Sequence, residues 1–322
     1  MTNHTVNDTP LSVHIFATSR CNLNCRHCFI EATSFSRNHK DLSSNAILNA
    51  VNIIHNISSK VDFEIEGGEI IMHPQFPDII GGIDEEVFPN ITITTNGTNS
   101  IDFAQMKLCG HKGSLRLRVS AEGHNEKIHN ILRSSKLADA FQFVEQGSKT
   151  GVNTVIRTTL HSENIEYISE MISAYAAAGA REIQFLEFQQ CGRGKQANNK
   201  HLVIDETAFK EAVNEFCSVA IPNDIQRMTL SLSSRRLKSL KSWNNHFFQS
   251  ATNKMGCKDA SLTFNWDGSI SICPWEPHET VIADRWPDDL SSFVINKLES
   301  GKLFHECDFC SAFKFIRGEN AK

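Results

Sequence analysis

The stretch Cys21-Asn-Leu-Asn-Cys25-Arg-His-Cys28 places three cysteines within eight residues, directly after a short β-rich run at residues 12–18. Thiolates with these spacings lie on one loop that can wrap around a single inorganic centre. A structural zinc site needs four protein ligands, so zinc would require His27 or a distant residue. A [4Fe-4S] cluster can be held by three cysteines with one iron left open. A cluster is therefore favoured, and a zinc loop or a chance grouping is the alternative.

The composition restricts the kind of protein that carries this loop. With 322 residues the chain can bury a large core without disulfides. The first ten residues lack the basic and apolar runs of a secretory signal, and no apolar stretch is long enough to span a bilayer. We expect a reducing, cytoplasmic location, where the ten cysteines serve metal binding or catalysis. The net charge of -5, spread along the chain, indicates neither nucleic-acid nor membrane partners.

Short β-rich runs alternate with helical stretches over the first two thirds of the chain. Six strands are predicted, at residues 12–18, 61–68, 90–97, 115–123, 152–160 and 182–188. Helices are predicted at residues 43–57, with Asp41 as the cap candidate, and at 75–86, 101–109, 137–150 and 162–178. This alternation favours an α/β fold in which helices cover the outer face of a parallel sheet. Periodicity alone fits either an open doubly wound sheet or a partial barrel.

The unusual polar residues follow the predicted strands at the point where each strand ends. They are the cysteine stretch after the first strand, Gly67-Gly68-Glu69 after the second, Thr95-Asn96-Gly97 after the third and Ser120-Ala-Glu122-Gly123 after the fourth. Ligands in parallel α/β folds bind outside the carboxyl ends of the strands. One rim of the sheet is therefore predicted to carry the site.

The pattern changes after the sixth strand. Residues 189–200 read as a polar loop, residues 205–218 as a capped amphipathic helix, and a boundary is predicted within 219–256. A hairpin turned at Asp267-Gly268 and a helix at residues 291–300 follow. The predicted organisation is a core at 1–218, a linker region at 219–256 and a small α+β module at 257–322.

Together, the CxxxCxxC loop after a first strand, the GGE motif after a second and the repeated β/α units resemble the radical S-adenosylmethionine (radical SAM) superfamily. The resemblance covers roughly residues 12–188 and implies a partial (β/α)6 TIM-type barrel. It implies a [4Fe-4S] cluster held by Cys21, Cys25 and Cys28, whose open iron binds SAM. One electron from the cluster then cleaves SAM, and the 5'-deoxyadenosyl radical abstracts a substrate hydrogen.

The resemblance also assigns contacts with SAM. His27 takes a position near the adenine that is usually aromatic, and Glu69 of GGE can accept a hydrogen bond from the SAM ammonium. The glycines Gly67 and Gly68 of the same motif permit close approach of the backbone.

The two remaining contacts come from the fourth and fifth strands. Ser120 and Glu122 suit the ribose diol, and Arg157 can pair with the SAM carboxylate. An ordinary turn at GGE and a surface ion pair for Arg157 are the alternatives.

A second set of cysteines lies in the C-terminal part. Cys257 is followed by ten residues, Gly268, four residues, Cys273 and, much later, Cys307-x-x-Cys310. Spacing alone leaves a zinc ribbon open. Behind a radical SAM core, the arrangement resembles the auxiliary-cluster module called Twitch, a shortened SPASM domain. The resemblance implies a second, fully ligated [4Fe-4S] cluster for electron transfer or closure of the barrel mouth.

The function predicted from these features is that of a radical SAM enzyme that matures a ribosomally synthesised peptide by epimerisation, crosslinking or oxidation. Cys191 follows the sixth strand on the same rim and is a candidate hydrogen donor to a substrate radical. The expected electron source is an external reductant such as flavodoxin or ferredoxin.

Two other functions stay open. A sugar or aminoglycoside dehydrogenase or epimerase is the alternative enzyme, because Twitch modules occur there too. With the first cysteine at residue 21, we expect no N-terminal leader-recognition domain, which weakens the case for a peptide. A non-catalytic zinc-binding interaction protein is the alternative of another class.

Overall fold

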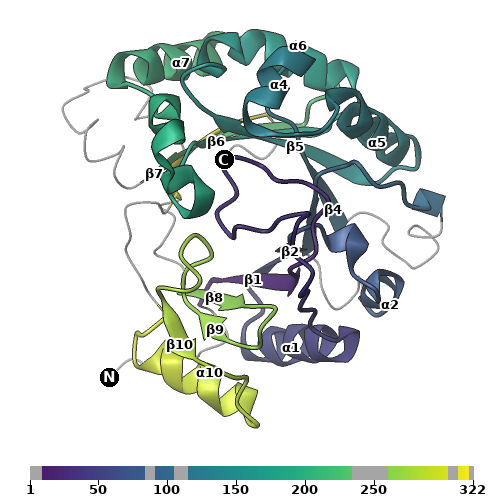
Figure 1. Ribbon diagram of the computed structural model, residues 1–322, viewed down its shortest axis with the longest axis vertical. Coiled ribbons are helices and arrows are strands. Elements are labelled where there is room, and N and C mark those ends of the chain that lie inside the picture. The colour runs from purple at the N-terminus through teal and green to yellow at the C-terminus, as the bar shows by residue number, and fades with distance from the viewer. Residues whose placement is uncertain (1–8, 84–90, 105–114, 234–259, 304–310, 319–322) are drawn as a thin grey trace.

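In the computed structural model, the described residues are 9–83, 91–104, 115–233, 260–303 and 311–318 (Figure 1). They form one sheet of eleven strands in the order β10-β9-β8-β1-β2-β3-β4-β5-β6-β7-β11. Six central strands are parallel and lie side by side in chain order: β1 (Leu11–Thr18), β2 (Val61–Gly67), β3 (Ile91–Thr95), β4 (Leu115–Ser120), β5 (Asn153–Leu160) and β6 (Glu182–Glu187). Because these six strands follow one another across the sheet in chain order without a reversal, they form a partial barrel and not a doubly wound sheet.

Further strands extend the sheet at both ends. β7 (Arg227–Ser233) pairs parallel with β6, and β11 (Ser311–Gly318) pairs antiparallel with β7. At the other end β8 (Ala260–Phe264) runs parallel to β1, followed by β9 (Ile270–Ser271) and β10 (Val281–Ala283). β7 therefore continues the parallel sheet within the range 219–256, where the sequence alone indicated a linker.

The helices lie around the outside of the curved sheet, and the loop after β1 crosses the middle of its opening (Figure 1). The α-helices are α1 (Ser44–Ile57), α2 (Phe76–Gly81), α4 (Glu126–Leu132), α5 (Leu137–Lys149), α6 (Ile168–Ala177), α7 (Glu206–Ser218) and α10 (Leu290–Glu299). Short 3-10 turns are η2 (Ile70–Met72), η3 (Ile165–Tyr167), η4 (Gly192–Lys195) and η5 (Ala197–Leu202). None of the described helices is long and apolar enough to cross a membrane.

Helix α1 shows how local sequence sets these boundaries. Its N-cap is Ser43, whose hydroxyl accepts a hydrogen bond from the Ala46 amide at 3.2 Å. The prediction of Asp41 as the cap is wrong. The Asp41 carboxylate instead accepts hydrogen bonds from the Thr18 hydroxyl and the Arg20 Nε, which tie it to the end of β1. Asp41 therefore stabilises the exit of the chain from β1.

The other helix predictions are largely confirmed. The predicted helices at 137–150, 162–178, 205–218 and 291–300 correspond to α5, η3 with α6, α7 and α10. The predicted helix at 75–86 is shorter, because α2 ends before Gly82, and most of the predicted helix at 101–109 lies outside the described residues. The hairpin of β8 and β9 turns at Asp267-Gly268, where Gly268 has φ of 88°.

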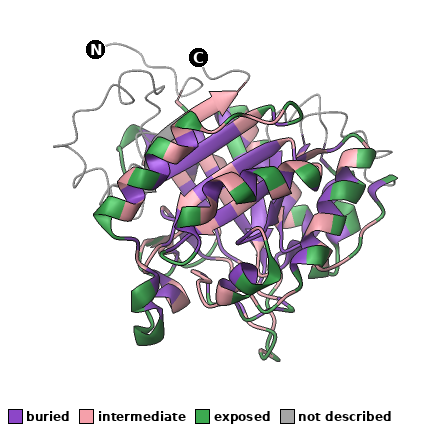
Figure 2. Cartoon of the chain, turned by 90° about the horizontal axis from the view of Figure 1, so that it is seen from above, coloured by how far each residue is buried: buried purple, intermediate pink, exposed green. Residues whose placement is uncertain are grey.

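The two faces of the sheet differ in polarity. On β1 and β2, Val13, Ile15 and Ile65 belong to the apolar core beneath the helices. Residues between them, such as His14 and Glu64, face the barrel interior, as the alternation of side chains along a strand requires. Figure 2 shows the strands buried at the centre and the exposed helix faces outside. The polar barrel interior is the feature that the site uses.

Candidate functional site

A cavity opens at the carboxyl ends of the parallel strands, and ten of the residues predicted from the sequence to bind the first metal centre, bind SAM or donate hydrogen line it. They are Cys21, Cys25, His27, Cys28, Gly67, Gly68, Ser120, Glu122, Arg157 and Cys191. These residues come from the loops and strand ends of β1, β2, β4, β5 and β6. The structure therefore brings the three cysteines of the first loop, Cys191 and the predicted SAM contacts to one cavity, with the exception of Glu69.

The three cysteines lie on the irregular loop after β1. Cys21 and Cys25 are more than nine-tenths buried, whereas Cys28 is half-buried. Burial raises the pKa of Cys21 to about 12, and it also raises the pKa of Cys25 against the opposing charges of Arg133 and Arg193. These thiols stay protonated at neutral pH unless a metal centre displaces their protons.

The spacing of the three sulfurs discriminates between kinds of metal centre. Thiolates that share one zinc ion at about 2.3 Å stand roughly 3.8 Å apart. Among the described residues, the only three side chains whose ligand atoms all lie within 4.8 Å of one another are His14, Glu64 and Glu66, so the cysteines are more widely spaced. In a [4Fe-4S] cluster each thiolate binds a different iron. The cysteine loop therefore fits a cluster better than a single ion.

The glycines of the GGE motif allow β2 to approach the start of this loop. A side chain at Gly68 would place its Cβ 2.2 Å from the Arg20 carbonyl oxygen, and one at Gly67 would place it 2.5 Å from that of Thr18. The Gly68 and Glu69 amides donate hydrogen bonds to these two oxygens, at 2.8 Å to Thr18 and 2.6 Å to Arg20. The glycines thus fix the position of the first cysteine.

Glu69 does not line the cavity. Its buried carboxylate accepts hydrogen bonds from the Thr95 hydroxyl at 2.6 Å and from the Asn96 amide at 2.7 Å. The Asn96 side chain in turn donates to Asn22 at 2.8 Å, on the cysteine loop. Burial raises the pKa of Glu69 in spite of these donors. In this structure Glu69 orients the TNG turn, and through it the loop, so its contact with the SAM ammonium remains a prediction.

Glu122 is held by a neighbour that the sequence did not single out. Its Oε1 lies 2.8 Å from the Arg133 Nε and 3.4 Å from the His27 Nε2, and its Oε2 accepts a hydrogen bond from the Thr159 amide at 2.6 Å. Burial alone would raise the pKa of Glu122, but Arg133 and the other donors lower it to about 2. Burial lowers the pKa of His27 to about 3. Glu122 is thus ionised and His27 neutral at pH 7.

Arg133 follows α4 and also reaches the cysteine loop, where its Nη1 lies 3.7 Å from the Cys25 Sγ. A single arginine therefore touches both the cysteine loop and the carboxylate predicted for the ribose. No sequence motif marks this arginine, because its role depends on where a short helix ends. Arg193 and Trp275 likewise line the cavity without a motif.

Arg157 lines the cavity together with Glu66 of β2. The Arg157 Nη2 stands 3.8 Å from the Glu66 Oε2, which is beyond hydrogen-bond range. Burial lowers the pKa of Arg157, although a guanidinium remains protonated in proteins. Arg157 thus presents a cation to the cavity, next to Ser120, which is also buried there.

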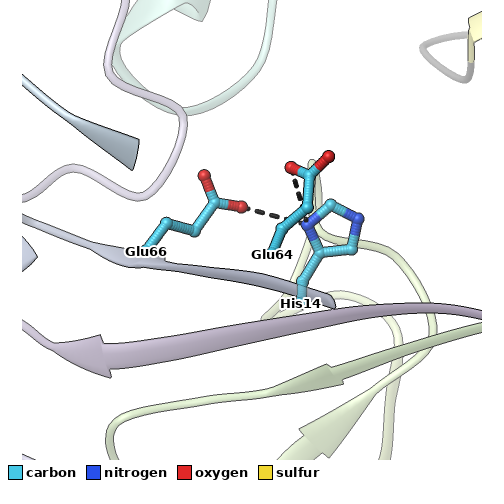
Figure 3. Close-up of side chains that lie close together, drawn as sticks. All are labelled: His14, Glu64 and Glu66. Carbon is cyan, nitrogen blue, oxygen red and sulfur yellow. Dashed lines mark hydrogen bonds and ion pairs between the residues drawn. The ribbon is translucent and has the colours of Figure 1, made fainter. Parts of the chain in front are cut away.

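Glu66 also belongs to a cluster of charged side chains in the barrel interior: His14, Glu64 and Glu66 point toward one another (Figure 3). The His14 Nδ1 lies 3.0 Å from Glu66 and 3.7 Å from Glu64. Burial alone would lower the pKa of His14, but the hydrogen bond with Glu66 and the charge of Glu64 raise it. Arg118 donates to both oxygens of Glu64, at 2.7 and 3.0 Å. Because this guanidinium engages both oxygens of Glu64, the contacts join the cluster into an ion-pair network.

Cys191 follows β6, is buried and lines the cavity. Burial raises the pKa of its thiol to about 12. A protonated thiol retains the S–H bond that hydrogen-atom donation requires. Its place in the cavity is compatible with the predicted role, which stays a prediction.

Of the second cysteine set, Cys257, Cys307 and Cys310 lie outside the described residues, and Cys273 is buried just after β9. The segment around Cys273 packs on the first cysteine loop. The ring centroids of Trp275 and Phe29 are 5.0 Å apart, and those of Trp266 and Phe16 are 5.9 Å apart. The C-terminal segment therefore adjoins the cavity.

Comparison with known proteins agrees with this geometry. The family described as the Radical SAM superfamily matches residues 15–174, which include the cysteine loop, the GGE motif and Arg157. The chain belongs to the radical SAM superfamily.

Two curated relatives within the superfamily illustrate its range. The chain is 24% identical over 203 residues to the antilisterial bacteriocin subtilosin biosynthesis protein AlbA of Bacillus subtilis, which covers 59% of this chain and 42% of AlbA. It is 23% identical over 270 residues to a probable GTP 3',8-cyclase of Sulfolobus acidocaldarius, covering 81% of this chain and 80% of the cyclase. The chain thus spans less than half the length of AlbA.

Among solved structures, SuiB of Streptococcus suis bound to SAM superposes with a TM-score of 0.68 at 15% identity. The match covers 92% of this chain and 68% of SuiB. The similarity extends past the radical SAM domain into the C-terminal part and establishes a shared fold.

Proposed function

We propose that the chain is an enzyme that cleaves SAM reductively at a [4Fe-4S] cluster held by Cys21, Cys25 and Cys28, and that the 5'-deoxyadenosyl radical abstracts a hydrogen atom from a substrate carbon. The observation that carries the proposal is the convergence of these cysteines with His27, Gly67, Gly68, Ser120, Glu122 and Arg157, which are all of the predicted SAM contacts except Glu69, on one cavity. The spacing of the sulfurs, too wide for one ion, supports a cluster.

The chain's own residues supply binding and orientation. Arg157 faces the cavity without a direct hydrogen bond to Glu66, so its guanidinium can pair with the SAM carboxylate. Ser120 can hydrogen-bond the ribose, and neutral His27 can lie against the adenine. Burial of the cavity walls keeps water away from a reactive radical.

For the substrate, we propose a ribosomally synthesised peptide natural product. AlbA is named as a bacteriocin biosynthesis protein. The structure of SuiB bound to its precursor peptide SuiA superposes on this chain with a TM-score of 0.68. The candidate reactions on this peptide are epimerisation, crosslinking and oxidation.

A small polar molecule, such as a sugar, is the second candidate substrate. The chain matches the probable GTP 3',8-cyclase of Sulfolobus acidocaldarius over 81% of its own length, and the name of that relative gives a small-molecule substrate. Arg157 and Glu66, two charged residues that line the cavity, suit a small polar substrate as well as a peptide.

Three further roles belong to the same proposal. Cys257, Cys273, Cys307 and Cys310 would hold a second [4Fe-4S] cluster in a Twitch-like module at 257–322, with zinc as the alternative, behind a core at 1–218. Cys191 would give its thiol hydrogen to a substrate carbon radical, and the resulting thiyl radical would take an electron and a proton to restore the thiol. A flavodoxin or ferredoxin would supply the electrons.

The first test is the metal content and SAM chemistry of the chain after anaerobic reconstitution. We expect about eight irons with matching sulfide for two four-iron clusters, and formation of 5'-deoxyadenosine under reducing conditions. The variant with Cys21, Cys25 and Cys28 replaced by Ala should retain one cluster and form no 5'-deoxyadenosine. Zinc without labile sulfide would exclude the proposed enzyme.

The second test separates the two substrate classes. Any peptide encoded by a short reading frame next to the gene is incubated with the reconstituted enzyme and SAM, and sugars and aminoglycosides are incubated in parallel. Faster 5'-deoxyadenosine release together with a mass change or epimerised residue in the peptide supports peptide maturation. Acceleration by sugars or aminoglycosides, with no effect of the peptide, would favour the small-molecule alternative.

A further inference from the structure

The loop after β6 holds the cysteine loop through one arginine. The Arg193 Nε donates a hydrogen bond to the Cys25 carbonyl oxygen at 2.7 Å, and its Nη2 donates to that of Ala32 at 2.8 Å. Its backbone amide donates to the Cys28 carbonyl oxygen at 3.0 Å. Two of these three acceptors belong to the predicted cluster ligands, and the third closes the same loop.

The backbone beside Arg193 is shaped for this contact. Gly192 has φ of 48°, and a Cβ at this position would lie 2.3 Å from the Phe29 carbonyl oxygen and 2.6 Å from that of Cys28. Only glycine adopts this conformation without strain and leaves room for the neighbouring carbonyls. The two loops are therefore built to touch at their backbones.

A buried asparagine, Asn199, joins the same two segments through the backbone carbonyls of Arg26 and Arg193. The Asn199 Nδ2 donates to the carbonyl oxygens of both Arg26 and Arg193, at 3.0 and 2.9 Å. The Arg26 Nε returns a hydrogen bond to the Asn199 Oδ1 at 2.9 Å. Because Asn199 is fully buried, these bonds are shielded from water.

The cysteine loop has little internal structure of its own to set its shape. Its internal backbone hydrogen bonds are long: 3.3 Å from the Cys28 amide to Cys25, 3.4 Å from Glu31 to Cys28 and 3.2 Å from Ser34 to Leu23. The bonds from Arg193 are shorter, and those from its guanidinium are charge-assisted. The shape of the loop thus depends more on the segment after β6 than on itself.

We propose that Arg193 is a positioning residue that holds the cysteine loop in the arrangement that receives its cluster. The proposal rests on the proposed function only for the identity of that cluster. Since Cys191 lies two residues away on the same segment and lines the cavity, one structural unit fixes both the cluster loop and the candidate hydrogen donor.

The first test needs no cluster: hydrogen–deuterium exchange of the iron-free protein, followed over residues 21–32. For Arg193→Ala we expect exchange about tenfold faster or more, because charge-assisted hydrogen bonds are lost. Arg193→Lys should also exchange faster, since one ammonium cannot span the Cys25 and Ala32 carbonyls. Lys195→Gln is the matched control, because Lys195 pairs with Glu279 and not with the cysteine loop.

Three outcomes would count against the proposal. Exchange at 21–32 within twofold of wild type in Arg193→Ala would show that the arginine does not hold the loop. Equal acceleration in β5 would show global destabilisation instead of a local contact. Slow, wild-type-like exchange in Arg193→Lys would assign the effect to charge and not to the bidentate geometry.

The second test uses the reconstituted protein. We expect Arg193→Ala to bind iron with lower occupancy and to give a broadened electron paramagnetic resonance spectrum in the presence of SAM, with Arg193→Lys between it and wild type. An unchanged spectrum would contradict the positioning role. If the wild-type chain assembled no cluster, the proposed function would fail, while the exchange measurement would still decide whether Arg193 holds the loop.

Discussion

Replacing Arg133 by Met should destabilise the iron-free protein through Glu122, the buried carboxylate that it contacts. The ordinary pKa of 4.5 for Glu122 falls to about 2 in the folded chain, where burial raises it and Arg133 is the foremost of the groups that lower it. A pKa shift of this size contributes roughly 3 kcal/mol to the free energy of unfolding at neutral pH. Most of this free energy should be lost in Arg133→Met, which keeps the volume but removes the charge.

The effect must depend on pH in one direction. Because the pKa of Glu122 is lowered by folding, its contribution is fully present above pH 4.5 and is lost as the pH falls toward 2. In Arg133→Met the carboxylate loses its main partner, so its pKa rises and little of this contribution remains. The difference in unfolding free energy between wild type and variant should therefore shrink below pH 4.5.

Urea unfolding of the iron-free proteins at pH 7 and at pH 3.5 measures both quantities. Lys149→Met removes an exposed i,i+4 ion pair with Glu145 and is the control, with an expected change below about 1 kcal/mol at either pH. A difference between wild type and Arg133→Met that stayed the same at both pH values would refute the reasoning. A loss at pH 7 no larger than that of the control would do so as well.

Three other predictions follow from single contacts. Gly68→Ala would place a Cβ 2.2 Å from the Arg20 carbonyl oxygen, so the cysteine loop should shift and the reconstituted protein should retain less iron. Full retention of iron would contradict the claim that the glycines fix the position of the first cysteine. Arg118→Ala leaves the partly buried Glu64 carboxylate without its bidentate partner and should lower the free energy of unfolding in urea by about 3 kcal/mol; a loss under about 1 kcal/mol would show that the pair contributes little to stability. Cys191→Ala, turned over in deuterated water, should lose deuterium incorporation; normal rate and incorporation would exclude the thiol as donor.

The features that the sequence predicted are those governed by local pattern. Alternating β-rich and helical runs predict six parallel strands. The polar residues where these strands end predict which rim of the sheet carries the site. The order of the strands, and hence the barrel, came from the resemblance and not from periodicity. The sequence pattern does not predict β7, because its run RMTLSLS lies within residues 219–256, where the change of pattern after the sixth strand indicates a linker.

The features that escaped prediction depend on contacts between distant residues. The motif predicts a contact of Glu69 with SAM, which stays a prediction, but it gives no sign of the hydrogen bonds that the Glu69 carboxylate accepts from Thr95 and Asn96. Arg133 and Arg193 carry no motif, because their roles arise from where α4 and β6 end relative to the cysteine loop. Spacing along the chain identified the ligands, whereas only the folded arrangement identifies the groups that hold them in place.

The most direct test of the central claim is formation of 5'-deoxyadenosine from SAM by the anaerobically reconstituted, reduced protein, compared with the variant in which Cys21, Cys25 and Cys28 are Ala. We predict release by the wild-type chain and none by the variant. Equal 5'-deoxyadenosine from both proteins, or none from a wild-type protein that carries its iron and sulfide, would contradict the claim that these cysteines hold the cluster that cleaves SAM.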